Sequence, residues 1–333
     1  MEKMSRSSSK CKDDTPPFLH IANLIIPWLT PQELSSLSCT CHTLSHLCKL
    51  ISTVRSSDAS RSFETHPIPF INTVDSRPYA FFLYTPTQLI SPNFSRQFWG
   101  FPANPNPTLN FNFKLSLDFG GNGCDCGEKC EIHDDCPCSL LRYGDGAQVI
   151  TECGLSCDCD SSCLNRVTQN GISVKLKIVR VTKKGWGLFA DQFISSGEFV
   201  CEYAGELLTT HEARRRHQLY DELAKGGQFS SALLVVREYL PSRKACFRIN
   251  IDATIMGNVS RFINHSCDGG NLTTVLVRSS GAVMPRVCFF TSRDVQAGEE
   301  LSFSYGNVRL QPQGFPCLCG CPTCFGILPS EPT

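Results

Sequence analysis

Residues 124–138 read CDCGEKCEIHDDCPC and residues 153–163 read CGLSCDCDSSC, and these two segments constrain the structure of the chain most strongly. They hold nine cysteines, an odd number that cannot pair off completely in disulfides. Three tetrahedral zinc ions need twelve ligand positions, which nine sulfurs supply if three of them bridge two ions. The spacing therefore predicts a trinuclear zinc cluster whose ligands are Cys124, Cys126, Cys130, Cys136, Cys138, Cys153, Cys157, Cys159 and Cys163.

A second group of cysteines lies near the end of the chain, in CLCGCPTC at residues 317–324. Its four thiolates could close one tetrahedral zinc site by themselves. Cys267 is distant in sequence and is a competing fourth ligand. The residues alone leave both ligand sets open: Cys317, Cys319, Cys321 and Cys324, or three of these with Cys267.

The composition limits the class of protein. The chain has 333 residues, 41% of them hydrophobic and 19% charged, which excludes bulk disorder. Its 31 basic and 31 acidic residues cancel, which argues against a whole-chain electrostatic nucleic-acid binder. No apolar run reaches the ~18 residues of a membrane span, and the first residues lack the apolar region of a secretory signal. With 21 cysteines, we therefore expect a reducing compartment where clustered cysteines bind metal.

The segment LIIPWLTPQELSSLSCTCHTLSHLC, at residues 24–48, has apolar residues at helical spacing. Thr30, Pro31 and Glu33 carry the capping box and the proline typical of a helix start. The sequence thus predicts two or three short helices over residues 18–64. This segment resembles an F-box, which would imply adaptor binding through residues 18–64. The alternative, which we favour, is a small helical cap that packs on the rest of the chain.

The segment between these helices and the first cysteines is rich in proline and aromatic residues, which favours short strands and loops that wrap another domain. From residue 172 onward, apolar and polar residues alternate as in a β-strand. One helix interrupts the strands. Thr209 and Glu212 predict a capping box at its start, and Gly226 with Gly227 predicts its end.

Further motifs follow the cysteines in a fixed order: CLNRVTQNG at residues 163–171, KKGWGLFA at 183–190, EYAGE at 202–206, RFINHSC at 261–267 and GEELSFSYG at 298–306. Together they resemble the pre-SET and SET regions of protein-lysine methyltransferases of the suppressor-of-variegation class. CLCGCPTC resembles the post-SET region, and PIPFINTVDSRPYAFFLY at residues 67–84 resembles the lead-in of the family. The brevity of the chain is most similar to the plant suppressor-of-variegation-related (SUVR) type. The resemblance covers residues 67–326.

This resemblance implies a mainly β fold with few helices. The expected SET-domain fold has small sheets and a knot-like C-terminal part, with zinc-stapled pre-SET and post-SET regions and a short helical N-terminal segment. We expect the chain to divide into a flexible tail (1–17), the helical segment (18–64), the lead-in (65–119), the pre-SET zinc cluster (120–171), the SET catalytic domain (172–306), and the post-SET zinc site with its tail (307–333).

The resemblance also implies a histone-lysine N-methyltransferase, which transfers methyl from S-adenosylmethionine to a lysine amine of the histone H3 tail. Tyr305 matches the catalytic tyrosine, and Tyr203 would line the lysine channel. Phe303 would face the amine, and because it cannot hydrogen-bond the amine, it favours a di- or trimethyl product. The residues expected to contact the cofactor are Lys184, Gly185, Trp186, Arg261, Asn264, His265 and Tyr305.

The resemblance selects Cys267 over Cys321 as the fourth post-SET ligand, beside Cys317, Cys319 and Cys324. About four zinc ions are then expected in all, three in the pre-SET cluster and one in the post-SET site. The expected location is the nucleus, with the enzyme associated with chromosomes and chromatin as a chromatin regulator. No membrane partner is expected.

The chain departs from the family pattern at three places. Ser304 stands where the family usually has aspartate, and residues 228–236 hold no tyrosine. Asp268, Gly269 and Gly270 lengthen the turn after NHSC. Two alternatives therefore stand beside the leading hypothesis: a lysine methyltransferase of a non-histone protein, and a weakly active zinc-stapled module that binds chromatin.

Overall fold

The computed structural model describes residues 17–90, 123–127, 130, 136, 138, 149–224, 229–239, 246–282, 284–306 and 315–329. The chain divides into two compact units, Met1–Val54 and Arg55–Thr333. Within the described ranges, no helix has both the length and the apolar character needed to cross a membrane.

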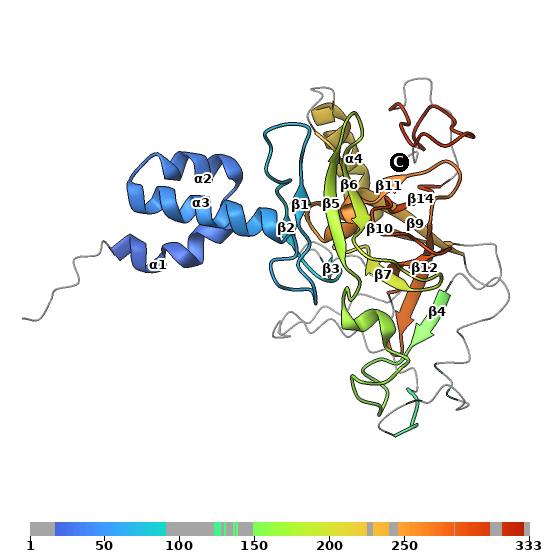
Figure 1. The fold of residues 1–333 in the computed structure, drawn as a ribbon. Coiled ribbons are helices and arrows are strands. Elements are labelled where there is room, and N and C mark those ends of the chain that lie inside the picture. Colours follow the sequence, from blue (N-terminus) through green and yellow to red (C-terminus); the bar gives the residue numbers. More distant parts are fainter. Residues whose placement is uncertain are drawn as a thin grey trace, which may run out of the picture. The chain divides into compact units, whose positions relative to one another are not determined.

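The first unit is helical (Figure 1). Its elements in chain order are α1 (Pro17–Ile25), the 3-10 turn η1 (Ile26–Trp28), α2 (Pro31–Ser38) and α3 (His42–Ser57). The predicted capping box is present at α2: the backbone N–H of Glu33 donates to Thr30 Oγ1 (3.3 Å), and that of Thr30 donates to Glu33 Oε2 (2.7 Å). A small core holds Ala22, Ile26, Leu34, Leu44 and Cys48. The expectation of a short helical N-terminal segment is confirmed.

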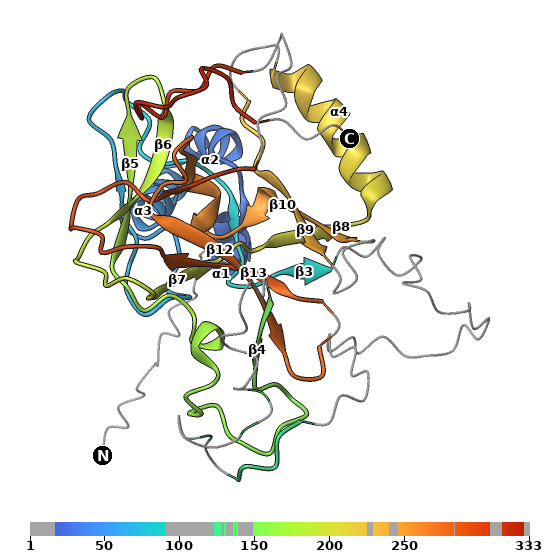
Figure 2. The ribbon, with the colours of Figure 1, turned by 90° about the vertical axis from the view of Figure 1, so that its right-hand side faces the viewer.

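The second unit consists of short strands in four sheets (Figures 1 and 2). The first sheet has β1 (Phe70–Ile71), β5 (Leu176–Val181) and β6 (Gly185–Ala190). The second has β2 (Leu83–Tyr84), β10 (Cys246–Gly257), β8 (Gly205–Leu208) and β3 (Leu89–Ile90), with β9 (Leu233–Tyr239) paired to β10. The third has β4 (Val149–Glu152), β12 (Leu272–Ser279), β13 (Arg286–Thr291) and β7 (Phe199–Glu202). The fourth pairs β11 (Asn264–His265) with β14 (Ser302–Phe303).

Few helices accompany these sheets. They are α4 (Thr210–Ala224) and the 3-10 turns η4 (Val167–Asn170) and η5 (Val259–Phe262). The expectation of a mainly β fold with few helices and small sheets is therefore confirmed for the described residues.

The predicted alternation after residue 172 forms part of the core of the second unit. Ile172, Val174, Leu176 and Ile178 are each at most 3% exposed, whereas the intervening Lys175 is exposed. Successive side chains of a strand point to opposite faces, so one face of this segment packs inward and the other faces solvent.

The lead-in joins the sheets through strands of two residues. β1, β2 and β3 pair in parallel with β5, β10 and β8. Glu64 attaches this segment to the start of the SET region, because its carboxylate accepts hydrogen bonds from Ile172 N (2.7 Å) and from the hydroxyl of Tyr84. Residues 91–119 of the expected lead-in lie outside the described residues.

At the start of helix α4 the structure contains one of the two hydrogen bonds of the predicted capping box: Thr209 Oγ1 accepts from Glu212 N (3.0 Å). The Glu212 carboxylate forms an ion pair with Arg216 (3.0 Å), whose guanidinium also reaches Glu206 (2.6 Å) and Asp252 (2.7 Å). This arginine therefore fixes α4 to β8 and β10. The glycine pair predicted to end the helix lies outside the described residues.

The last sheet brings two distant motifs side by side. β11 and β14 run parallel, with Asn264 opposite Ser302 and His265 opposite Phe303. Gly270 closes the lengthened turn against the same strand at a φ of +72°, and a Cβ there would lie 2.3 Å from Ser302 O. Only glycine fits such a position, so this turn holds RFINHSC against GEELSFSYG.

Candidate active site and zinc clusters

A cavity of about 270 Å³ lies beside β11 and β14. Lys184, Asn264, His265 and Glu300 are among the residues that line it. A smaller cavity of about 100 Å³ shares the first three of these residues and adds Tyr305. The structure thus brings together four of the residues predicted to hold the cofactor.

Glu300 fixes two of these side chains. Lys184 Nζ lies 2.9 Å from Glu300 Oε2, and Asn264 Nδ2 donates to Glu300 Oε1 (2.8 Å). Gly187 leaves the room for this contact, since a Cβ there would lie 2.9 Å from Glu300 Oε1. Sequence reasoning did not single out Glu300, although GEELSFSYG contains it. Its partners lie on other motifs, and only the fold shows them.

Gly185 and Trp186 follow Lys184 in the same motif, and their backbone shapes this part of the site. Gly185 has a φ of +89°, which favours glycine. The carbonyl of Trp186 accepts from Asn264 Nδ2 (3.3 Å), and its ring lies between Phe70 (5.2 Å, edge-on) and the Arg180 guanidinium (5.4 Å). Neither Gly185 nor Trp186 is among the described residues that line the two cavities.

Three aromatic side chains, those of Tyr305, Phe303 and Phe289, pack together, and Tyr305 among them lines the smaller cavity. Tyr305 N donates to His265 Nδ1 (3.1 Å), and the Tyr305 hydroxyl donates to Ile263 O (2.7 Å). Phe303 is 4% exposed, with its ring centroid 4.9 Å from that of Tyr305 and 4.7 Å from that of Phe289. The hydrogen of the Tyr305 hydroxyl is thus engaged, which leaves its oxygen lone pairs available.

Two predicted site residues lie apart from the lining residues described for these cavities. Tyr203 is 6% exposed, and its hydroxyl donates to Ala232 O (2.7 Å). The Arg261 guanidinium lies over the rings of Phe82 (5.0 Å) and Phe262 (5.3 Å), and burial lowers the pKa of Arg261 to about 10. Within the described part of the chain, Arg261 Nη1 is buried without a hydrogen-bond partner.

The nine pre-SET cysteines gather in one place. Seven are at most 4% exposed, and Cys126 and Cys157 are half-buried. Burial raises the pKa of Cys138 to about 12, so the thiol stays protonated unless a cation stabilises the thiolate. An all-sulfur donor set fits zinc. Three groups of sulfurs lie within 4.8 Å of one another, and Cys124 belongs to each: Cys124, Cys136, Cys138 and Cys153; Cys124, Cys126, Cys130 and Cys136; Cys124, Cys130, Cys153 and Cys159.

The post-SET cysteines form a second group beside the cavities. The sulfurs of Cys267, Cys317, Cys319 and Cys324 lie within 4.8 Å of one another. Cys321 is outside this group, with its sulfur 3.4 Å from that of Cys319. Cys319 also lines both cavities, and Cys267 Sγ lies 3.2 Å from His265 Nε2. This second zinc-competent group therefore borders the candidate active site.

Two of the departures from the family pattern lie near the cavities. Ser304 is exposed, and its Oγ accepts from Gly306 N (3.3 Å). Asp268 of the lengthened turn lines the larger cavity, and its Oδ1 accepts from Ser266 Oγ (2.5 Å) and Gly270 N (3.1 Å). The longer turn therefore adds a carboxylate to the cavity wall.

Comparisons with known proteins agree with this geometry. A family described as SET domain matches residues 185–306, and one described as Pre-SET motif matches residues 60–166. The chain is 53% identical to histone-lysine N-methyltransferase SUVR3 of Arabidopsis thaliana, over 95% of this chain and 92% of that protein.

Two solved structures are also similar. The methyltransferase domain of human SETMAR superposes with a TM-score of 0.61 at 29% identity, covering 82% of this chain and 97% of that domain. KRYPTONITE in complex with mCHH DNA, an H3(1–15) peptide and SAH superposes with a TM-score of 0.58 at 26% identity, covering 82% of this chain and 53% of that one.

Proposed function

The chain belongs to the SET-domain histone-lysine N-methyltransferases, and we propose that it transfers the methyl group of S-adenosylmethionine to a lysine of the histone H3 tail. The observation that carries this proposal is the placement of Tyr305. Its phenol lies beside Phe303 and His265 at the end of a cavity that Lys184 and Asn264 also line.

The larger cavity suits the cofactor by its charges. Lys184 and Arg293 line it together with Asp268, Glu299 and Glu300, so the wall carries both signs. The amino-acid end of S-adenosylmethionine also carries both signs, as an ammonium and a carboxylate. When bound, the cofactor supplies an electrophilic methyl group on a cationic sulfur. Lys184, Asn264 and His265 are the residues that would hold it.

Tyr305 is suited to orient the reacting groups. Because its hydroxyl donates to Ile263 O, the oxygen lone pairs can accept weak C–H···O contacts from a methyl group or a hydrogen bond from an amine. Partial desolvation of its hydroxyl and the nearby Glu300 carboxylate raise the pKa of Tyr305 above its ordinary value, so the phenol remains neutral. Positioning of this kind supplies much of the rate in an in-line displacement.

The lysine amine must lose a proton before it attacks. Its pKa in water is about 10.4, and burial in an apolar channel, of which we expect Phe303 to form part, lowers that pKa. A dedicated general base is then not required. Because Phe303 has no hydroxyl to restrain a methylated amine, we expect the enzyme to add two or three methyl groups.

The structure and the family also support proposals about the bound zinc ions and about where the protein acts in the cell. The two cysteine groups would hold about four zinc ions, three in the first and one in the second. A histone methyltransferase acts on chromatin in the nucleus, and we place this enzyme there, associated with chromosomes.

The helical unit supports a separate proposal, that residues 18–64 bind an adaptor. Leu24 and Trp28 are 72% and 67% exposed, so these two large apolar side chains are available to a partner. Replacing both by serine should weaken an adaptor complex and leave peptide methylation unchanged.

A histone peptide array with isotope-labelled S-adenosylmethionine tests the main proposal. Labelled H3 peptides are expected with the native protein, and Tyr305→Phe is the matched control. Absence of label on every histone, with label on another protein, would favour a non-histone substrate. Absence of label on all proteins, with retained binding to nucleosomes, would favour the weakly active chromatin-binding module.

A further inference from the structure

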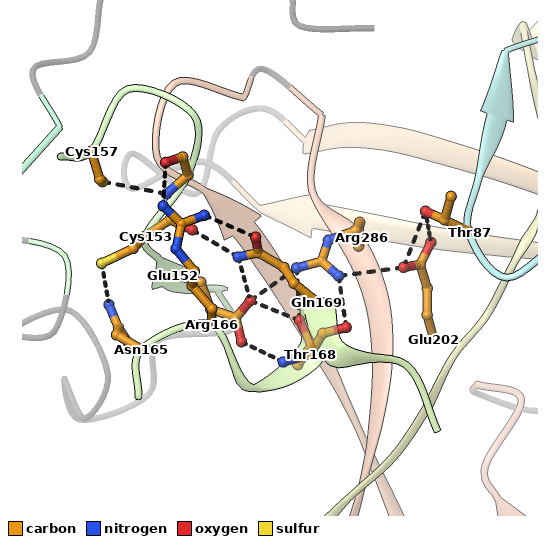
Figure 3. Close-up of polar contacts among 11 residues, drawn as sticks. Thr87, Glu152, Cys153, Cys157, Asn165, Arg166, Thr168, Gln169, Glu202 and Arg286 are labelled. Atoms are coloured by element: carbon orange, nitrogen blue, oxygen red, sulfur yellow. Dashed lines mark hydrogen bonds and ion pairs between the residues drawn. The ribbon is translucent and has the colours of Figure 1, made fainter. Parts of the chain in front are cut away.

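A buried polar network joins the segment with the first cysteine cluster to the strand that precedes Tyr203 (Figure 3). Arg286, the first residue of β13, lies at its centre. Its Nη2 donates to Glu152 Oε2 (3.0 Å) and Thr168 Oγ1 (2.7 Å), and its Nη1 lies 3.4 Å from Glu202 Oε2. The side chains of Glu152 and Glu202 are only 1% and 6% exposed. One guanidinium thus forms ion pairs with two buried carboxylates.

The Glu152 end of the network is tied to the cysteines. Glu152 directly precedes Cys153, and its carboxylate also accepts from Thr168 N (2.8 Å) and Gln169 Nε2 (3.1 Å). Gln169 Nε2 donates in turn to Cys153 O (2.7 Å). From the same short segment, Arg166 donates to Cys159 O (3.0 Å). The position of Glu152 therefore depends on the backbone around the cysteines.

The Glu202 end of the network is tied to Tyr203. Glu202 directly precedes Tyr203, and its carboxylate also accepts from Gln88 N (2.9 Å). Its carbonyl accepts from Asn258 Nδ2 (2.8 Å). Tyr203 N donates to the carbonyl of Val287 (2.7 Å), the residue after Arg286. Arg286 and Val287 therefore hold both Tyr203 and the residue before it.

Electrostatics make Arg286 hard to replace in this place. Removing one partner of a buried ion pair leaves an uncompensated charge, and here removal of the arginine would leave two buried carboxylates. A lysine is a poor substitute, because only the planar fork of a guanidinium can reach both carboxylates and Thr168 at once. The two carboxylates are thereby held at a fixed separation.

We propose that Arg286 is a positioning residue for methyl transfer: through Glu202 and Val287 it places Tyr203 at a position set by Glu152 and the adjoining cysteine segment. A change in the structure of the first cysteine cluster would therefore shift Tyr203 in the wall of the lysine channel. The inference rests on the proposed function and on the family resemblance, which implies that Tyr203 lines that channel. The route bypasses the cofactor cavities, because Glu152, Arg286 and Glu202 are absent from the lining described for them.

Steady-state kinetics of the full chain on an H3 peptide test this proposal. We expect Glu152→Gln and Arg286→Met to lower kcat by ~10- to 100-fold, as for a small misplacement of a reacting group, with little change in KM for S-adenosylmethionine. Arg278→Met is the matched control. Arg278 lies on β12 of the same sheet, and the change breaks its ion pair with buried Glu238 of β9 (2.8 Å), so thermal stability should fall and kcat should not. An unchanged kcat in folded Glu152→Gln would overturn the proposal.

A double-mutant cycle shows whether Arg286 connects the two carboxylates. The kcat losses of Glu152→Gln and Glu202→Gln should be non-additive in free energy when combined. Independent losses would contradict the proposal. Should Arg286→Met fail to fold, these two variants carry the test.

Hydrogen exchange with mass spectrometry gives a readout that does not need activity. In Glu152→Gln we expect faster exchange at residues 199–204, with the zinc content of the native protein. Unchanged exchange there, or a kcat loss that follows zinc loss across the variants, would overturn the proposal. A native protein that methylates no histone peptide would refute the proposed function, and the exchange measurement would still decide whether the network positions Tyr203.

Discussion

The two cysteine clusters share one ligand chemistry and serve different parts of the molecule. In both views the green segment beyond β4 and the red segment near β11 and β14 lie at opposite ends of the sheets (Figures 1 and 2). In the first cluster, buried cysteines pack on one another and take the place of an apolar core. In the second, Cys319 lines the cavities and Cys267 contacts His265. The first cluster should therefore govern folding and act on catalysis only at a distance, whereas the second should contribute directly to the active site.

Metal removal should separate the clusters most clearly. We expect about four zinc ions per chain by elemental analysis after gel filtration. A strong chelator should unfold residues 120–163 first, because metal-binding energy there is folding energy. Hydrogen exchange during chelation follows this order. Active protein with one zinc or none would contradict the zinc assignment, and earlier exposure of the SET sheets would contradict the order of unfolding.

Single cysteine variants of the second cluster should affect catalysis while the fold persists. Cys267→Ser is expected to abolish methyl transfer, because it removes a ligand beside His265. Cys321→Ser should be mild, since that sulfur lies outside the group of four. Circular dichroism and peptide methylation measure the two effects. If Cys321→Ser is as harmful as Cys324→Ser, the ligand assignment is wrong.

A variant that leaves both clusters intact isolates the catalytic contribution. Tyr305→Phe removes one hydroxyl and its bond to Ile263 O. Turnover should fall by ~10²- to 10³-fold, as for a positioned polar group lost from an active site, while zinc content stays native. Turnover close to that of the native enzyme would make Tyr305 a packing residue.

The smallest expected effect concerns the number of methyl groups. Phe303→Tyr adds a hydroxyl beside Tyr305 that can hold a water or the amine, so the product should shift toward monomethyl-lysine. Mass spectrometry of the peptide over time measures this shift. Monomethyl product alone from the native enzyme at long times would refute the role of Phe303.

Local patterns made much of this structure predictable from the sequence. The short spacing between the cysteines is typical of a metal site, so both clusters could be located in the sequence without knowing how the sheets pair. The alternation after residue 172 and the caps at Thr30 and Thr209 also operate over a few residues, and the structure contains each of them. The motif resemblance then supplied the order of the parts.

Contacts between distant residues could not be predicted in the same way. Arg286 lies 134 residues after Glu152, and a charged residue at the start of a strand ordinarily indicates a solvated position. Glu64 and Ile172 are 108 residues apart, and no sequence feature of either segment indicates that the two are in contact. Such pairs become visible only when the sheets bring them together.

The parallel pairing of the lead-in has a consequence for the order of events during synthesis. Leu83 and Tyr84 of β2 find their partners at Met256 and Gly257, which the ribosome adds about 170 residues later. At 5–20 residues per second, this delay is roughly 10–35 s. During that time β2 lacks its neighbour in the sheet. Nascent chains of this protein should therefore depend on chaperones until the long strand β10 emerges, and synthesis halted before it should leave the lead-in open to proteases.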